Sequence, residues 1–409
     1  MIQPSADNHV SNSNSKQWLS VICLAFATFI FNTTEFIPIG LLSSIATDFK
    51  MTETGAGIMI TVYAWAVALL SLPLMLIFAR TESRKLLGFV FAVFVISNAI
   101  SYESDSFYML MASRLGVACA HAVFWAIAPP LAVRIAPAGK QSVALSILTV
   151  GSSLAMILGL PIGRTIGLYL GWRITFLSIA ITAFIIMIVL MKDLPKLPSK
   201  NKSSKESIPH IFQNKALMSV YLLTVLTITG HFCGYSYIEP FLTYVIHLSK
   251  NVTTLALLIF GFTGILGSLL FSRYNNRWSI PFAFWSVGGI MVSLLLLKLF
   301  SFSELGTFGV IMVWGVAISI FNLSYQSRII KLSPENTDIA MAIFSAIYNV
   351  GIGSGAYIGG LISSKAGLSN IGLIGFAFVA VAFMYGLLYV KPLLLKGIKK
   401  EDGEKKYAN

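Results

Sequence analysis

Charged residues are scarce in this chain of 409 residues, since Asp, Glu, Lys and Arg make up 11% of it while 56% is hydrophobic. A typical soluble domain is about 25% charged. The chain therefore lacks the polar residues that would cover a water-soluble globule of its size. This deficit predicts a protein that crosses a membrane several times.

Cysteine is also rare. Cys23, Cys119 and Cys233 are the only three cysteines, and all of them fall in apolar stretches. Their positions match neither a disulfide framework nor a metal-ligand spacing. The chain also lacks a His-x-x-x-His pair, a nucleophile elbow and a phosphate-binding loop. The sequence therefore predicts no metal, no cofactor and no enzymatic activity.

Long apolar runs dominate what remains, and most reach the ~20 residues that a helix needs to cross the hydrocarbon core. Twelve stretches qualify: 18–43, 55–79, 86–101, 107–133, 142–166, 173–191, 216–241, 251–272, 279–300, 307–327, 339–363 and 369–391. The predicted fold is an all-α membrane protein with twelve transmembrane helices in two pseudo-symmetric six-helix bundles. The expected divisions are a bundle over 1–191, a cytoplasmic linker over 192–215, a bundle over 216–391 and a cytoplasmic tail over 392–409.

The net charge of +13 is unevenly placed along the chain. Most Lys and Arg residues fall in the two tails and in the loops that follow even-numbered spans. This is the positive-inside pattern, which predicts that both termini are cytoplasmic. The basic excess thus indicates membrane topology and attraction to anionic lipid rather than binding of nucleic acid.

Internal repetition links the two halves. Three glycines of the fifth span and its end recur 196 residues later, pairing Gly159, Gly163 and Gly171 with Gly355, Gly359 and Gly367. Repeated halves are typical of secondary transporters, which bind substrate near the membrane midplane between the halves. Chance matching of small residues in apolar helices is the alternative explanation.

Two acidic residues lie inside the predicted spans. Glu35 precedes Pro38 in the first span, and Glu239 precedes Pro240 in the seventh. Their offset is 204 residues, and we expect a loop-length difference to explain the departure from 196. A carboxylate in a bilayer is costly and marks a functional site. Both are therefore candidates for proton coupling, although Glu239 is close enough to the end of its span to be interfacial.

The fourth span carries a polar stripe. His121 and Trp125 each fall within about 20° of Arg114 around the helix, so the three share one helix face. Glu35 and Arg114 are at a similar depth, so their side chains can interact. We expect Arg114 and His121 to join Glu35 in proton coupling. Simple packing for His121, and a structural ion pair for Arg114, are the alternatives.

Aromatic rings and amides within the spans indicate a polyol cargo, because a sugar has apolar C–H faces and polar hydroxyl edges. The candidate substrate-binding residues are Asn32, Trp65, His121, Trp125, Tyr235, Phe321, Asn322, Tyr348 and Asn349. For each of them, packing at the membrane interface or between helices is the alternative role.

Several motifs resemble one known family. The basic loop Arg80-Thr-Glu-Ser-Arg84-Lys85, and Gly159-Leu-Pro161-Ile-Gly163 in span five, are similar to motifs of the major facilitator superfamily. The segments FIFNTTEFIPIGLL, RLGVACAHAVFW, GLPIGR and GWRITF resemble the bacterial sugar efflux transporters of the drug/proton antiporter group. The resemblance implies gating roles for Arg80, Arg84, Gly159, Pro161 and Gly163.

The resulting hypothesis is proton-coupled export of small sugars or glycosides by a monomer in the bacterial inner membrane. A drug or nucleoside antiporter of the same fold is the first alternative. A passive facilitator is less favoured, because the spans carry isolated carboxylates rather than an acidic ring. A membrane enzyme is least favoured, because no catalytic set is present.

Overall fold

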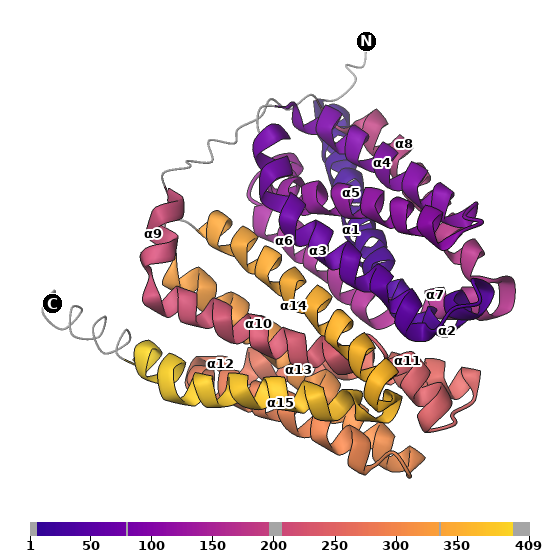
Figure 1. Ribbon diagram of the computed structural model, residues 1–409. Helices are drawn as coiled ribbons and strands as arrows, with labels where there is room; N and C mark the ends of the chain where they lie inside the picture. The colour runs from indigo at the N-terminus through magenta and orange to yellow at the C-terminus, as the bar shows by residue number, and fades with distance from the viewer. Residues whose placement is uncertain (1–5, 79–80, 196–206, 335–336, 396–409) are drawn as a thin grey trace, which may run out of the picture. The chain divides into compact units, whose positions relative to one another are not determined.

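The computed structural model describes residues 6–78, 81–195, 207–334 and 337–395 (Figure 1). Helices account for the regular structure in these ranges, and twelve of them are long and apolar enough to cross a membrane. The predicted all-α fold and the number of spans are confirmed. The observed span limits lie within a few residues of the predicted ones, and the helix of the second span extends to Phe78.

The chain divides into two compact units, 1–50 with 69–202 and 51–68 with 203–409. The first half of the chain contains α1 Ala6–Gly40, α2 Leu42–Asp48, α3 Glu53–Phe78, α4 Ser83–Tyr102, α5 Phe107–Ile135, α6 Gln141–Leu154, η1 Ala155–Gly159, α7 Leu160–Leu170 and α8 Trp172–Asp193. Helix α3 is divided between the units, since its first part groups with the second unit.

The second half begins with a short helix, α9, inside the stretch predicted as a linker. Its elements are α9 Ser207–Gln213, α10 Lys215–Tyr235, α11 Ile238–Pro240, η2 Phe241–Val245, α12 Lys250–Leu299, α13 Glu304–Leu332, α14 Thr337–Ala366, η3 Leu368–Asn370, α15 Ile371–Tyr385 and η4 Gly386–Val390. Helix α12 supplies two spans, which meet at a kink where Trp278 has non-helical angles of φ −123° and ψ 28°. The predicted tail 396–409 lies outside the described residues.

Span five is interrupted by one π-helical turn. The turn is η1, and it leads directly into α7, whose first turn contains Pro161. Proline has no N–H with which to bond the carbonyl four residues earlier, and its ring crowds that carbonyl. A π-turn widens the helix at this point and accommodates the proline. The sequence pattern of glycines around Pro161 thus marks a local change of helix geometry.

Glycines set how closely span five approaches α1 in the first unit. A Cβ at Gly159 would overlap Thr33, and a Cβ at Gly163 would overlap Ile37. Each glycine therefore sits against a residue 126 positions earlier, and the two helices run side by side in the same direction. Close approach at small residues is the main way that membrane helices pack.

The second unit repeats this contact in the same register. A Cβ at Gly355 of α14 would overlap the Thr229 carbonyl of α10, and one at Gly359 would meet the Cys233 carbonyl. The spacing is again 126 residues. These glycines are therefore structural counterparts of Gly159 and Gly163, and the 196-residue repeat extends to α1 and α10.

The repeat also reaches the loop that follows each of these spans. Gly171 and Gly367 both have positive φ, at 96° and 89°. Only glycine adopts this conformation without strain. The 196-residue spacing seen in the sequence therefore reflects equivalent backbone geometry, not chance.

Candidate functional site

The first unit buries a carboxylate beside an imidazole. His121 Nε2 of α5 lies 3.6 Å from Glu35 Oε2 of α1, and the two side chains are 4% and 9% exposed. A carboxylate removed from water is stable only when it is paired, hydrogen-bonded or protonated. The pair can therefore exchange a proton between a neutral and a charged state, which is the chemistry that proton coupling needs.

Arg114 contacts the residue that precedes this carboxylate. Its Nη2 donates to the Thr34 carbonyl at 2.9 Å, and the side chain is 1% exposed. Pro38 stands four residues after Thr34 and has no N–H to donate, so it leaves that carbonyl without its helical partner. Arg114 thus supplies the hydrogen bond that Pro38 cannot, and it places a fixed positive charge one residue from Glu35.

Three further residues lie near this site on α1 and α5. Two of them, Phe31 and Asn32, pack against other helices, and Trp125 keeps part of its surface exposed. Phe31 lies between Phe94 and Phe124, with ring centroids 4.0 Å away on each side. Asn32 donates to the Ser152 hydroxyl of α6 at 2.5 Å, so its amide links two helices. Trp125 remains half-buried, with its ring centroid 6.2 Å from that of His121. Trp125 therefore offers an aromatic ring with exposed surface next to the Glu35–His121 pair.

The second unit holds a different polar pair at the equivalent place. Trp314 Nε1 of α13 donates to His231 Nδ1 of α10 at 2.9 Å. Tyr235 stacks on His231 with centroids 5.2 Å apart, and Phe260 stacks on Tyr235 at 4.7 Å. Because Nδ1 accepts this hydrogen bond, the neutral imidazole carries its proton on Nε2.

The shared glycine register shows which residues correspond. At an offset of 196, the counterpart of Glu35 is His231. The expected equivalence of Glu35 and Glu239, with a loop-length difference between the halves, is wrong, because α1 and α10 pack against their partners at the same spacing. Glu239 lies eight residues beyond that position.

Glu239 follows a break in span seven. Helix α10 ends at Tyr235, and Glu239 lies in the short α11 that precedes a π-turn. Its side chain is buried, and Thr243 Oγ1 donates to its Oε1 at 3.3 Å. It is thus enclosed within protein, and its role in proton coupling stays a prediction.

Other predicted substrate residues are distributed over the second unit. Trp65 Nε1 approaches the Ser354 hydroxyl at 3.4 Å. Tyr348 donates to Asn322 Oδ1 at 3.0 Å, and Asn349 donates to the carbonyl of Ser345 on its own helix. All these polar groups lie in α3, α13 and α14.

Phe321 is a predicted substrate-binding aromatic residue that is enclosed by protein, as Tyr235 is. It is fully buried, and it packs on Tyr325 with ring centroids 4.5 Å apart. Such a ring offers no open face to a cargo molecule in this conformation. Its contact supports a packing role.

The predicted gating residues show two kinds of contact. Arg84 Nη2 donates to the Met191 carbonyl at the end of α8, and Glu82 caps the first turn of α4 by accepting from the Arg84 and Lys85 backbone N–H groups. Arg80 lies outside the described residues. In span five, Gly159 and Gly163 pack on α1, and Pro161 follows the π-turn.

Arg164 is a buried cation to which sequence analysis assigned no role. It donates to the Gly40 carbonyl at the end of α1 and is 2% exposed. Arg114 and Arg164 thus both donate hydrogen bonds to carbonyls in the last two turns of α1, at Thr34 and Gly40. The available signal was an arginine inside an apolar span, close to a helix end that a proline marks.

No group of three His, Cys, Asp or Glu side chains that could hold a metal ion is found in the described ranges. Glu35 and His121 supply this site with groups for proton exchange and hydrogen bonding.

Comparison with known proteins defines the class. The chain matches the Major Facilitator Superfamily over residues 24–337 and 234–407, and it belongs to this family. It is a multi-pass membrane transporter, and transporters of this superfamily bind small-molecule substrates.

Solved structures agree on the fold. A bacterial homologue of the human lysosomal transporter Spinster, inward-facing and unoccupied, shares 15% identity over 93% of this chain and 98% of its own, with a TM-score of 0.73. The nucleoside transporter NupG shares 15% sequence identity over 91% of this chain and 100% of its own, with a TM-score of 0.71. The human organic anion transporter MFSD10 shares 13% sequence identity over 90% of this chain and 98% of its own, with a TM-score of 0.67. At these identities the likeness concerns the fold alone.

Proposed function

We propose that this transporter exports small sugars or glycosides from the cytoplasm in exchange for protons, in the manner of the drug/proton antiporter group. The observation that carries the proposal is the buried Glu35–His121 pair at 3.6 Å, with Arg114 held on the adjacent Thr34 carbonyl. A carboxylate so placed needs either a proton or a hydrogen-bonding partner.

Exchange follows if the proton and the cargo compete for that carboxylate. A sugar hydroxyl donates to the ionised Glu35 and offsets the loss of water around its charge. A proton on Glu35 removes the charge, so the sugar binds less tightly, although a neutral carbonyl oxygen still accepts a hydrogen bond from it. Each crossing then carries one of the two, and the inward proton gradient drives the sugar outward.

The cargo class rests on the polar groups near aromatic rings. Trp125 presents a half-buried ring beside His121, which suits an apolar sugar face. Tyr348 and Asn322 form a hydroxyl–amide pair of the kind that exchanges hydrogen bonds with a polyol. A site for lipophilic drugs would be more uniformly apolar.

The direct test is transport by the purified chain in proteoliposomes with an imposed pH gradient. The compounds tested are pentoses, hexoses, galactosides, nucleosides and a cationic drug. We expect ΔpH to drive sugars against their concentration gradient, and a protonophore to abolish this movement. Transport of nucleosides or drugs alone would assign another cargo. Movement only down the sugar gradient would identify a facilitator.

A matched pair of variants ties the result to the site. Trp125→Ala removes the ring beside His121, whereas Phe89→Ala removes a ring on α4 that is 56% exposed and that packs on Phe78. Trp125→Ala should raise the KM for sugar roughly 5- to 100-fold, as expected for loss of ~1–3 kcal/mol of stacking and contact. Equal, small effects of both changes would remove Trp125 from the cargo pathway.

The proposal also includes location and orientation. We place the chain in a bacterial inner membrane with both termini in the cytoplasm, on the basis of the Lys and Arg distribution. We also propose that the chain works as a monomer.

A further inference from the structure

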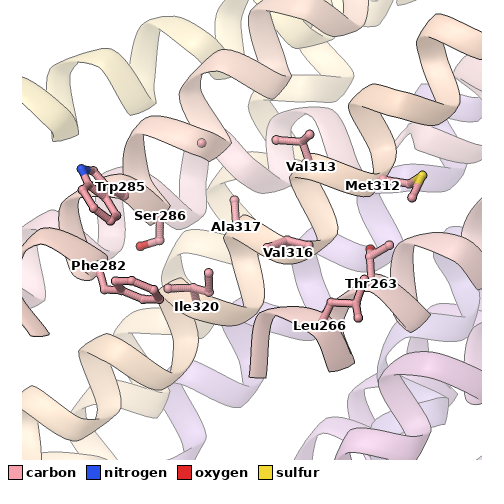
Figure 2. Close-up of a pocket in the computed structure, with 11 residues that line it drawn as sticks. Thr263, Leu266, Phe282, Trp285, Ser286, Met312, Val313, Val316, Ala317 and Ile320 are labelled. Carbon is pink, nitrogen blue, oxygen red and sulfur yellow. The ribbon is translucent and has the colours of Figure 1, made fainter. Parts of the chain in front are cut away.

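A groove in the second unit is suited to a hydrocarbon chain. It has a volume of about 340 Å³ and lies among both spans of α12 and the middle of α13 (Figure 2). We call its small lining residues, Thr263, Ser286, Gly289 and Ala317, the floor. The larger residues that also line it are Leu266, Phe282, Trp285, Met312, Val313, Val316 and Ile320.

The lining offers few groups to a polar cargo. Ser286 Oγ donates to the Ala283 carbonyl at 2.8 Å, and Thr263 Oγ1 donates to the Phe260 carbonyl at 2.9 Å, so both hydroxyls are satisfied by their own helix. Trp285 is nevertheless 61% exposed at the edge of the groove. An exposed apolar groove on membrane-spanning helices is open to lipid rather than to a sugar.

Two cations lie where these helix faces reach the nearest membrane surface. Arg273 is seven residues after Leu266, and Lys331 is eleven after Ile320, so each lies within about 20° of its groove residue around the helix. At 1.5 Å per residue they stand about 10 and 16 Å from those residues along the helix. Both side chains are exposed.

The kink of α12 and the C-terminal end of α13 are joined by a hydrogen bond, and acidic residues are missing from long segments of both helices. Arg328 Nη2 of α13 donates to Ser279 Oγ at 3.0 Å, just past the kink in α12. Trp278, at that kink, stacks on Trp285 with centroids 6.1 Å apart. The sequence contains no Asp or Glu from Asn251 to Ser303 or from Leu305 to Pro334. The charged side chains of these two segments are therefore all basic, and the next acidic residues in the chain are Glu335 and Asp338.

We propose that this groove is a binding site for an anionic glycerophospholipid. One acyl chain lies along the floor between Trp285 and Val313, and the phosphate sits between Arg273 and Lys331. The acyl chain gains little by leaving the bilayer, because surrounding lipid is equally apolar. Selectivity therefore comes from the headgroup, at roughly a fivefold preference for each basic side chain near the membrane surface.

Tryptophan fluorescence tests this with brominated lipids. The chain is placed in phosphatidylcholine nanodiscs, and phosphatidylglycerol with bromine on its acyl chain is titrated against brominated phosphatidylcholine. Half-maximal quenching should need about 5- to 25-fold less phosphatidylglycerol. Trp285→Phe should remove the lipid-selective part of the quenching. Equal half-maximal fractions for the two lipids, or unchanged selective quenching in Trp285→Phe, would overturn the proposal.

Charge variants separate the site from general attraction. Arg273→Gln with Lys331→Gln should reduce the preference to about onefold to twofold, while Arg273→Lys with Lys331→Arg should keep it. Lys391→Gln, at the exposed end of span twelve, is the matched control and should also keep it. A preference that survives the double neutralisation, or that Lys391→Gln removes equally, contradicts the assignment.

A salt titration of the unaltered chain needs no variant. At 1 M salt the Debye length falls to about 3 Å, so the preference should drop to about onefold to twofold. A preference that persists at this salt concentration would also overturn the proposal.

Discussion

Replacing Glu35 by glutamine should uncouple sugar movement from the proton gradient. Glutamine has nearly the same shape and keeps a carbonyl oxygen for His121, which lies 3.6 Å away in the native pair. The hydrogen bond from Arg114 to the Thr34 backbone does not depend on the carboxylate. The variant should therefore fold and bind sugar, and only the titrating group is lost.

The size of the effect follows from the driving force. One proton that moves through 100 mV gains about 2.3 kcal/mol, and one pH unit adds about 1.4 kcal/mol. A tightly coupled one-for-one exchanger can then hold a sugar concentration ratio of several hundredfold. Glu35→Gln should reduce this ratio to about one, while exchange of labelled for unlabelled sugar continues at equal concentrations.

The assay compares net accumulation with counterflow exchange in the same proteoliposomes. Glu304→Gln, in the exposed first turn of α13, removes a carboxylate outside the site and should behave as the native chain. A Glu35→Gln variant that still builds a ΔpH-dependent ratio of several hundredfold would refute the reasoning. Loss of the gradient in Glu239→Gln but not in Glu35→Gln would move the coupling to the seventh span.

Three further predictions concern packing and topology. Gly355→Ala should lower the free energy of unfolding by about 1–3 kcal/mol, because its Cβ would meet the Thr229 carbonyl and the Phe232 Cβ. The control Gly309→Ala, with no neighbour within 4 Å of its Cβ, should leave the free energy of unfolding unchanged or raise it by up to ~1 kcal/mol. Thermal unfolding in detergent measures both, and equal shifts would contradict the packing argument. Trp314→Phe should destabilise by about 1–2 kcal/mol through loss of the bond to His231 and of ring volume, whereas Trp285→Phe, at a more exposed ring, should change the midpoint little; the opposite order would argue against this role for His231. A cysteine at Phe212, exposed on α9, should react with an impermeant thiol reagent only in inside-out vesicles; labelling from outside intact cells would reverse the topology.

Sequence reasoning predicted the fold to the level of spans because the bilayer imposes a length and an apolar composition on each helix. Those requirements act on local stretches of sequence, so twelve spans could be counted directly. The repeat was also visible, since close helix approach and positive φ both require glycine. Gly159, Gly163 and Gly171 therefore kept their spacing to Gly355, Gly359 and Gly367.

Part of the site was also predictable from local chemistry. An acidic residue and an arginine in apolar spans stand out because their charge is costly there. The spacing of Arg114 and His121 on one helix placed them on a common face. Both side chains do reach α1, one at the Thr34 carbonyl and the other at Glu35.

The pairings themselves depended on tertiary structure. Depth suggested Arg114 as a partner of Glu35, and its charge does act on that carboxylate. The packing of α5 against α1 also brings His121 to Glu35, with Nε2 3.6 Å from Oε2. The missing N–H of Pro38 directs Arg114 to a backbone carbonyl. Similarly, the Glu-Pro pairs at 35–38 and 239–240 suggested a correspondence that the packing register does not support.

The sequence by itself therefore determined the spans, the repeat and the set of costly polar residues, because each of these follows from local composition and spacing in a membrane. Which of those residues meet was decided only in three dimensions. Helix rotation and register arise from contacts between segments far apart in the chain, such as Gly355 on Thr229, and these contacts place His231, not Glu239, at the position equivalent to Glu35.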